Sequence, residues 1–133
     1  MTKREELFND LKEAGPLYLA TVDGDQPKAR PLGFRMLEND QIYFITGKFK
    51  DAYKQMQANP KVEFTGTVEG KIIRYNGEAT FDEDETLLEK AYEIMPMLKD
   101  MFSAPGLEPA VFHLENAKAE YKNMMELEKT IEF

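Results

Sequence analysis

Two lysines stand where a short helix is expected to begin, which is an unfavourable position for positive charge. The segment Ile45–Val62, ITGKFKDAYKQMQANPKV, predicts a strand end, a turn at Gly47 and a helix that stops at Asn59. The first turn of a helix carries partial positive charge because its N–H groups lack partners, so Lys48 and Lys50 need an offsetting anion. The simplest hypothesis is that this turn binds an anionic ligand.

A second cation is expected to reach the same turn from a neighbouring strand. A strand is predicted over 26–37, and we expect it to pair as a hairpin with the strand predicted over 41–46. Arg30 then converges with Thr46 and Lys50. Arginine offers a planar fork to phosphate oxygens, and lysine offers a point charge. These side chains predict a site for a phosphate monoester.

The charge distribution agrees with a small anionic ligand. The chain has 133 residues and a net charge of −8. Between Lys28 and Lys61, however, seven basic residues face three acidic ones. The acidic remainder repels a polyanion, so we expect no nucleic-acid partner. A solvated basic face is the alternative. The basic residues of this window are Lys28, Arg30, Arg35, Lys48, Lys50, Lys54 and Lys61.

Several kinds of active site are not expected, because the chain lacks the side chains that they require. The chain has no cysteine, one serine (Ser103) and one histidine (His113), so a Ser-His hydrolase and a transition-metal site are not expected. The Thr46-Gly47-Lys48 triplet lacks the other residues of a P-loop. No apolar run is long enough to cross a bilayer, and the amino-terminal segment is charged rather than signal-like. We therefore expect no membrane contact and a cytoplasmic location.

The predicted elements form one domain over 1–133, of α+β class and mainly β. Helices are predicted over 2–14, after Gly47, through 87–94 and over 97–103. Antiparallel strands with helices inserted between them predict a small β-barrel. The strands are predicted over 17–23, 26–37, 41–46, 61–69, 71–81 and 110–122, the last bent at Glu115-Asn116.

Other charged residues are left open between structural and ligand-binding roles. Strand alternation turns Arg35 away from Arg30 unless a bulge intervenes. Arg74 and His113 lie among apolar residues, where paired structural roles are more common. Tyr75 and His113 are the candidates for a general acid, and the catalytic residues stay unassigned. The methionines predict helix packing first, and an adaptable pocket or a subunit contact as the alternative; they are Met95, Met97, Met101, Met124 and Met125.

Three segments in this order resemble a known family: YLATVDGDQPKARPLGF, IYFITGKFKDAYKQMQANPKVEF and IIRYNGEATF. They are similar to the pyridoxamine 5′-phosphate oxidase-like, FMN-binding split-barrel family, and within it to small nitroimidazole-reductase-like members. The resemblance implies a six-stranded antiparallel split β-barrel, Greek-key-like, with short flanking helices. It implies that Arg30, Thr46 and Lys50 hold the FMN phosphate. By the same resemblance, the flavin ring and ribityl chain contact Pro31, Leu32 and Ile45.

The same resemblance implies a function. It implies a homodimer with each flavin at the subunit interface, and an FMN-dependent oxidoreductase acting on a small molecule, with a nicotinamide as candidate electron donor. Alternatives are a non-catalytic flavin-binding or electron-transfer protein, or a split barrel that binds haem or a deazaflavin. The acidic end NMMELEKTIEF lacks the Arg and His that grip substrate phosphate in vitamin B6 oxidases, and Ile72 replaces a flavin-contacting glutamine. Genuine pyridoxamine-phosphate oxidase activity is therefore not expected.

Overall fold

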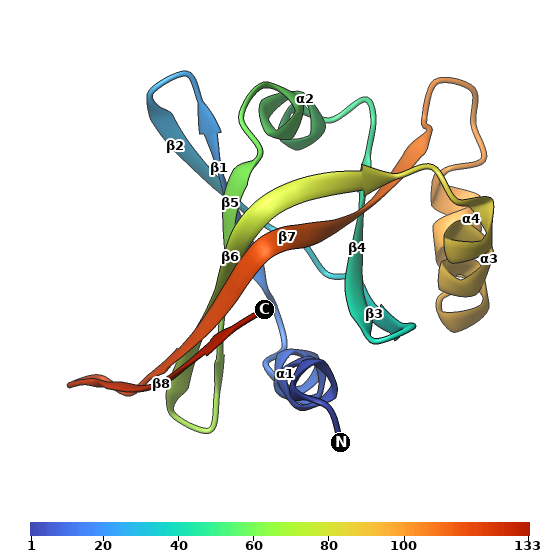
Figure 1. Cartoon of the computed structure of the whole chain (residues 1–133). Coiled ribbons are helices and arrows are strands. Elements are labelled where there is room, and N and C mark those ends of the chain that lie inside the picture. The colour runs from blue at the N-terminus through green and yellow to red at the C-terminus, as the bar shows by residue number, and fades with distance from the viewer.

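The computed structural model describes all residues from 1 to 133, and every helix expected from the sequence is present. The chain folds into four short helices and eight strands (Figure 1). Their bounds are α1 (Lys3–Glu13), β1 (Tyr18–Asp23), β2 (Gln26–Pro31), β3 (Arg35–Glu38), β4 (Gln41–Gly47), α2 (Asp51–Ala58), β5 (Lys61–Val68), β6 (Lys71–Asp82), α3 (Glu85–Ile94), α4 (Met97–Met101), β7 (Pro109–Lys122) and β8 (Leu127–Glu132).

The strands form one antiparallel sheet that curves into a split barrel. Its order is β2-β1-β5-β6-β7-β4-β3, and β8 adds to β7 outside this path. The long strands β6 and β7 bend through the middle of the molecule, with α1 and α2 at opposite ends and α3–α4 against the β4 side (Figure 1). The predicted α+β split barrel is confirmed, with eight strands in place of six.

The segment 26–37 is two strands rather than the single strand predicted. β2 pairs with β1, matching Arg30 to Leu19, whereas β3 pairs with β4, matching Arg35 to Phe44. The expected hairpin between the Arg30 strand and β4 is therefore wrong. The break falls at 32–34, directly after Pro31, which has no N–H for a ladder. Here the chain crosses from one end of the sheet to the other.

This crossing is held by packing on both sides. The Leu32 N–H donates to the Leu17 carbonyl at 2.8 Å, and the Leu32 side chain enters the interior of the barrel. The Phe34 side chain instead joins a second apolar cluster, beneath α3 and α4. Burying a side chain of this size stabilises a protein by about 1.5–3 kcal/mol. The crossing segment thus ties the two clusters together.

Alternation along β4 separates the two clusters. Phe44 points into the barrel and stacks on Phe64 with ring centroids 4.0 Å apart, while Ile45 faces outward to Val111 and Leu87. Both faces of β4 are therefore covered, and the strand reads as a continuous apolar run.

Two local predictions concern the ends and bends of elements. Thr2 and Glu5 form the expected capping box of α1, with the Glu5 N–H donating to Thr2 Oγ1 at 3.1 Å. The expected bend in β7 is a bulge at Asn116, where φ is 48° and Gly77 on β6 lies opposite. No helix of the protein combines the length and apolar character that spanning a bilayer requires.

Candidate ligand-binding site

All six residues singled out from the sequence line one cavity of about 320 Å³. The members are Arg30, Pro31, Leu32, Ile45, Thr46 and Lys50. They come from the end of β2, the crossing segment, the end of β4 and the start of α2. The opposite wall is apolar and belongs to the α3–α4 region, through Met95, Leu98, Met101 and Phe102. The cavity therefore has a cationic end and an apolar end.

The crossing segment, and not a hairpin, brings Arg30 near Thr46. Since β2 and β4 do not pair, the approach depends on the chain turning at 32–34 to enter β3, which lies beside β4. The expected convergence is thus present by a different route. The positions lie at strand ends, where loops can present polar groups without breaking a ladder.

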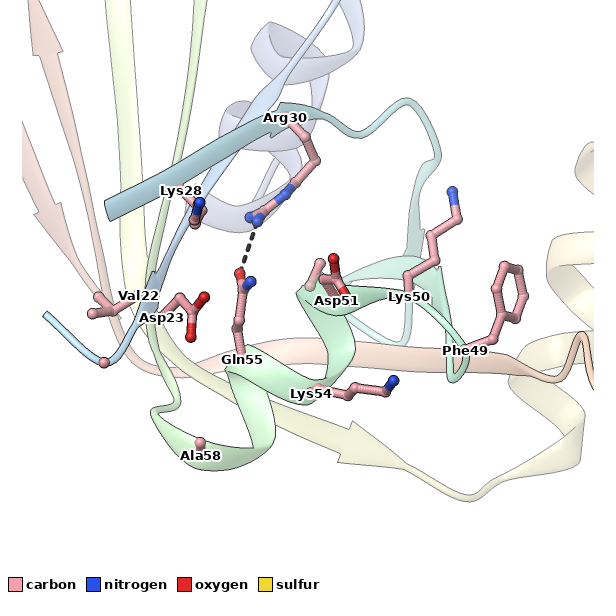
Figure 2. Close-up of a pocket in the computed structure, with 12 residues that line it drawn as sticks. Val22, Asp23, Lys28, Arg30, Phe49, Lys50, Asp51, Lys54, Gln55 and Ala58 are labelled. Atoms are coloured by element: carbon pink, nitrogen blue, oxygen red, sulfur yellow. Dashed lines mark hydrogen bonds between the residues drawn. The ribbon is translucent and has the colours of Figure 1, made fainter. Parts of the chain in front are cut away.

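Arg30 is held by a hydrogen-bonded triangle with Thr21 and Gln55. Its Nη1 donates to Thr21 Oγ1 at 2.7 Å and to the Leu19 carbonyl at 3.1 Å, and its Nη2 donates to Gln55 Oε1 at 2.8 Å. The Thr21 hydroxyl in turn donates to Gln55 Oε1 at 2.6 Å. Figure 2 shows Gln55 rising from α2 to meet Arg30 from β2. These bonds fix the plane of the guanidinium.

The same bonds leave one edge of the guanidinium available. Arginine has five N–H donors, and three are used here, which leaves Nε–H and one Nη2–H of Arg30 without partners. Burial lowers the pKa of Arg30, and the nearby Asp51 carboxylate partly offsets this effect. The group remains a cation at neutral pH, because arginine titrates far above it. Two parallel donors on a fixed cation suit an oxyanion.

The first turn of α2 faces the same space without a cap. Lys50 occupies the N-cap position, and no side chain accepts a hydrogen bond from the first turn. The N–H groups of Asp51, Ala52 and Tyr53 also have no backbone acceptor. Thr46 is buried, and its hydroxyl has no hydrogen bond within the protein. An uncapped helix start beside a lysine and an arginine is a ready anion site.

Lys48 and Lys50 differ in what offsets their charge. Lys48 Nζ lies 3.8 Å from Glu108 Oε2, so a carboxylate of the same chain partly offsets its charge in an exposed ion pair. Lys50 has no carboxylate within ion-pair distance and lines the cavity. The lysine pair in the sequence is thus one structural ion pair and one unpaired cation. Only Lys50 is left for a ligand.

A larger cleft of about 750 Å³ opens beyond the cavity, between the β1–β2 turn and α2. Arg30, Lys50 and Ala52 line both spaces. Figure 2 draws the lining of this cleft, with Lys50 towards one end and Asp23 towards the other. Both volumes lie in or near the range of pockets that bind small molecules.

Three residues whose roles the sequence leaves undecided lie outside the cavity: Arg35, Arg74 and His113. Arg35 donates to the carbonyls of Leu11, Lys12, Gly15 and Gly33, at 2.7–3.2 Å, and so closes the end of α1. Its pKa is lowered by burial.

His113, on β7, has both ring nitrogens next to carboxylates and does not line the cavity. Its Nδ1 lies 2.7 Å from Asp82 Oδ2 and its Nε2 lies 3.3 Å from Glu115 Oε1. Arg74 is exposed on β6 and does not line the cavity, and Tyr75 is buried inside the barrel. Neither candidate general acid therefore reaches the cavity.

Sequence reasoning missed the residues that support the site. Gln55 and Thr21 act only through Arg30, so no spacing rule identifies them as site residues. The only sequence feature that could have indicated Gln55 is its polar side chain one turn after Asp51 on an amphipathic helix. Met95, Met101 and Phe102 lie in the methionine-rich segment after Ile94. The sequence predicts helix packing or an adaptable pocket there, but it does not indicate which element the segment packs against. Their position against β4 depends on tertiary packing.

A family model described as pyridoxamine 5′-phosphate oxidase matches residues 4–122. The chain belongs to the pyridoxamine 5′-phosphate oxidase family. A search of curated proteins found no significant match. Among solved structures, a NimC/NimA family protein from Clostridium acetobutylicum is 32% identical, with a TM-score of 0.87 over 98% of this chain and 92% of the other.

More distant members of this fold carry different ligands in their names. A pyridoxamine 5′-phosphate oxidase-related, FMN binding protein from Nostoc punctiforme is 19% identical, with a TM-score of 0.63 over 100% of this chain and 97% of the other. A heme binding protein from Mycobacterium smegmatis is 11% identical, with a TM-score of 0.72 over 99% of this chain and 58% of the other. At these identities the likeness concerns the fold alone.

The residues present fit a flavin mononucleotide. The free edge of Arg30, the Lys50 ammonium and the uncapped start of α2 are a donor set for a phosphate. The apolar wall of Leu32, Ile45 and the α3–α4 residues suits an aromatic ring. In this member of the pyridoxamine 5′-phosphate oxidase family, the polar and apolar ends of the cavity therefore match the two ends of FMN.

Proposed function

We propose that this protein binds FMN in the cavity and acts as an oxidoreductase on a small molecule. The observation that carries the proposal is that Arg30, with two N–H donors unused by the protein, lines one cavity together with Lys50 and the uncapped start of α2. Arg30, Thr46 and Lys50 would hold the phosphate, and Pro31, Leu32 and Ile45 would contact the ribityl chain and ring. When bound, a flavin supplies hydride and electron transfer.

The alternative of haem binding is less well supported by the side chains available. Haem iron is held by His, Cys, Tyr or Met side chains in proteins. This chain has no cysteine, and neither His113 nor any tyrosine lines the cavity. Both ring nitrogens of His113 already face carboxylates. Met95 and Met101 are the remaining candidates, so a flavin is the better match to the cationic end.

We further propose that the protein works as a homodimer. Apolar side chains of α3 and α4 next to the cavity are exposed: Ile94 by 58%, Met97 by 60% and Met101 by 54%. Clustered exposed apolar residues mark interaction surfaces. A second copy placed there would cover the apolar wall of the cavity and complete the surroundings of the flavin ring.

A titration with FMN tests the proposed site. We expect Lys50→Ala to weaken FMN binding about 10- to 100-fold, because a charge-assisted hydrogen bond contributes about 1.5–3 kcal/mol. Arg30→Ala should weaken it at least as much. Lys48→Ala is the matched control, since its charge is offset by Glu108, and it should bind FMN like wild type. Wild-type affinity in both Lys50→Ala and Arg30→Ala would refute the site.

Turnover separates an enzyme from a flavin carrier. With FMN bound, we expect steady oxidation of a reduced nicotinamide when a small electron acceptor is present, and slow oxidation without it. A protein that binds FMN but shows no acceptor-dependent turnover would be a flavin-binding or electron-transfer protein instead. The phosphate contacts would be the same in both cases.

A further inference from the structure

Phe49 is an exposed aromatic side chain next to the cationic end of the site. It directly precedes Lys50, the N-cap of α2, and 40% of it is exposed. It lines the cleft beside Lys50, at the opposite end from Asp23 (Figure 2). A hydrophobic residue before an N-cap often packs on the fourth residue of the helix, but here that residue is Lys54. Capping of α2 therefore does not account for Phe49.

The ring of Phe49 lies directly on the backbone of Gly47, at the end of β4. A Cβ atom added to Gly47 would lie 2.5 Å from Phe49 Cε1 and 2.8 Å from Phe49 Cζ. Non-bonded carbon atoms keep about 3.5–4.0 Å apart, so such a Cβ would displace the ring. The φ angle of Gly47 is not positive. The contact with Phe49, and not the backbone conformation, is therefore what requires glycine here.

On its other side the same ring meets Phe102, the C-cap residue of α4. The two ring centroids are 6.4 Å apart, with an angle of 56° between the ring planes. This separation is within the range of favourable aromatic pairs. Phe102 lines the cavity and packs against the apolar cluster beneath α3 and α4. Phe49 thus contacts the turn that carries Lys50 on one side and the apolar wall of the cavity on the other.

The backbone of this turn is attached to the loop before β7. The Lys48 N–H donates to the Glu108 carbonyl at 2.8 Å, and the Lys50 N–H donates to the Gly47 carbonyl at 3.0 Å. These bonds fix the turn relative to the sheet. The pair of Phe49 and Phe102 extends the attachment from the backbone of the turn to α4.

We infer that Phe49 is a positioning residue that holds the cationic end and the apolar end of the site at the spacing a flavin needs. The inference rests on the proposed flavin function and extends it. A ligand that spans both ends binds tightly only if their spacing is fixed in advance, because ordering the two walls during binding costs free energy. A ligand that uses the apolar end alone does not depend on this spacing. Phe49 should therefore matter for FMN and much less for riboflavin, which lacks the phosphate.

Fluorescence titrations with FMN and with riboflavin, on the full chain, test this role. We expect Phe49→Ala to weaken FMN binding about three- to tenfold and riboflavin binding by less than about twofold. Phe49→Tyr keeps the ring and should restore the wild-type ratio of the two affinities. Leu127→Ala is the matched control, because it truncates an apolar side chain on β8 that is 49% exposed. It should leave both affinities unchanged.

A double-mutant cycle with Gly47→Ala tests the contact beneath the ring. Alone, this substitution should lower the FMN-to-riboflavin affinity ratio about as much as Phe49→Ala does, because the new Cβ displaces the ring. In the Phe49→Ala background it should change the ratio by less than about twofold, because the atoms that the Cβ would meet are absent. Urea denaturation should show that each variant is folded, since the displaced ring belongs to an exposed side chain.

The possible results separate this inference from the proposed function. An equal loss of FMN and riboflavin affinity in Phe49→Ala, or an unchanged ratio, would overturn the positioning role and leave the FMN site in place. Effects of Gly47→Ala and Phe49→Ala that multiply in the double variant would overturn it as well. A wild-type protein that binds neither flavin would refute the proposed function, and the inference with it.

Discussion

Gln55 on α2 accepts a hydrogen bond from Arg30 on β2 through a single oxygen that also binds the Thr21 hydroxyl. This contact joins a helix to the sheet and fixes which N–H donors of Arg30 are used within the protein. Arg30 on a bare strand could rotate about its side-chain bonds. Held by Gln55, it presents Nε–H and one Nη2–H at little further cost in side-chain entropy.

Gln55 is therefore a positioning residue for the anion site. We expect Gln55→Glu to weaken FMN binding about tenfold or more, because a carboxylate would pair with Arg30 and repel the phosphate. Gln55→Leu, which adds no charge, should have a smaller effect of about three- to tenfold. The measurement is an FMN titration of each variant. Gln57→Glu, on an exposed position of the same helix, controls for the charge change, and an equal effect there would contradict the positioning role.

Arg35 should prove structural. Its guanidinium donates to three carbonyls at the end of α1, where the helix dipole favours a cation. We expect Arg35→Ala to lower the free energy of unfolding by about 2–4 kcal/mol in urea denaturation. FMN affinity of the folded variant should match wild type. Arg74→Ala, on an exposed position, should change stability by less than about 0.5 kcal/mol. Weak FMN binding by folded Arg35→Ala would show a role at the site instead.

We expect the folded protein to lose stability at alkaline pH because of Tyr75. Its hydroxyl is buried and no hydrogen bond of good geometry reaches it, although the Arg4 guanidinium is near; burial raises its pKa from 10.0 to about 12, and Arg4 opposes this rise. The folded state thus keeps the proton to higher pH than the unfolded state. The stabilisation is complete below pH 10 and is lost as the pH rises from 10 to about 12, by about 2–3 kcal/mol.

Tyr75→Phe tests this linkage directly. Removing a hydroxyl that has no partner should leave stability near neutral pH unchanged or slightly raised. The decline between pH 10 and 12 should become shallower in the variant, as measured by the urea midpoint at each pH. Parallel alkaline declines in wild type and Tyr75→Phe would assign the effect to other tyrosines, such as Tyr43 and Tyr121, whose pKa values are also raised by burial.

Tyr121 should contribute to stability at neutral pH, in contrast to Tyr75. Its hydroxyl donates to Asp10 Oδ2 at 2.7 Å and joins β7 to α1. We expect Tyr121→Phe to cost about 1.5–3 kcal/mol, since it leaves the carboxylate without its donor. Tyr18→Phe, with an exposed ring, is the control. Equal unfolding midpoints for the two variants would refute the contribution.

A small β-barrel and the meeting of Arg30, Thr46 and Lys50 were predicted from local patterns, whereas the split barrel and the roles of Pro31, Leu32 and Ile45 were implied by the family resemblance. The capping box at Thr2, the turn after Asp23 and the strand–turn–helix run from Gln41 each follow from residues that are adjacent in the chain. Arg30, Thr46 and Lys50 line one cavity as expected, although the hairpin from which their convergence was predicted does not form. The sequence also favoured a solvated Lys48 and a ligand-binding Lys50, but it did not indicate the ion pair of Lys48 with Glu108, which is distant in sequence.

The partners of strands were the least predictable feature. No local sequence feature indicates that β2 pairs with β1 while β3 pairs with β4, because both halves of the segment 26–37 have strand-like composition. The strand β8 was missed since five of its six residues are exposed and only Ile131 is buried. Such an edge strand owes its structure to pairing with β7 and carries little alternating signal.

The crossing at 32–34 has a consequence for the kinetics of folding. The cavity needs the crossing segment, the start of α2 and α4 together, so it exists only once both ends of the sheet have closed. A transition state with an unfinished sheet has no place for a ligand. Flavin should therefore slow unfolding and leave the refolding rate unchanged. In a chevron plot, saturating FMN would lower the unfolding arm and leave the folding arm where it stands in the free protein.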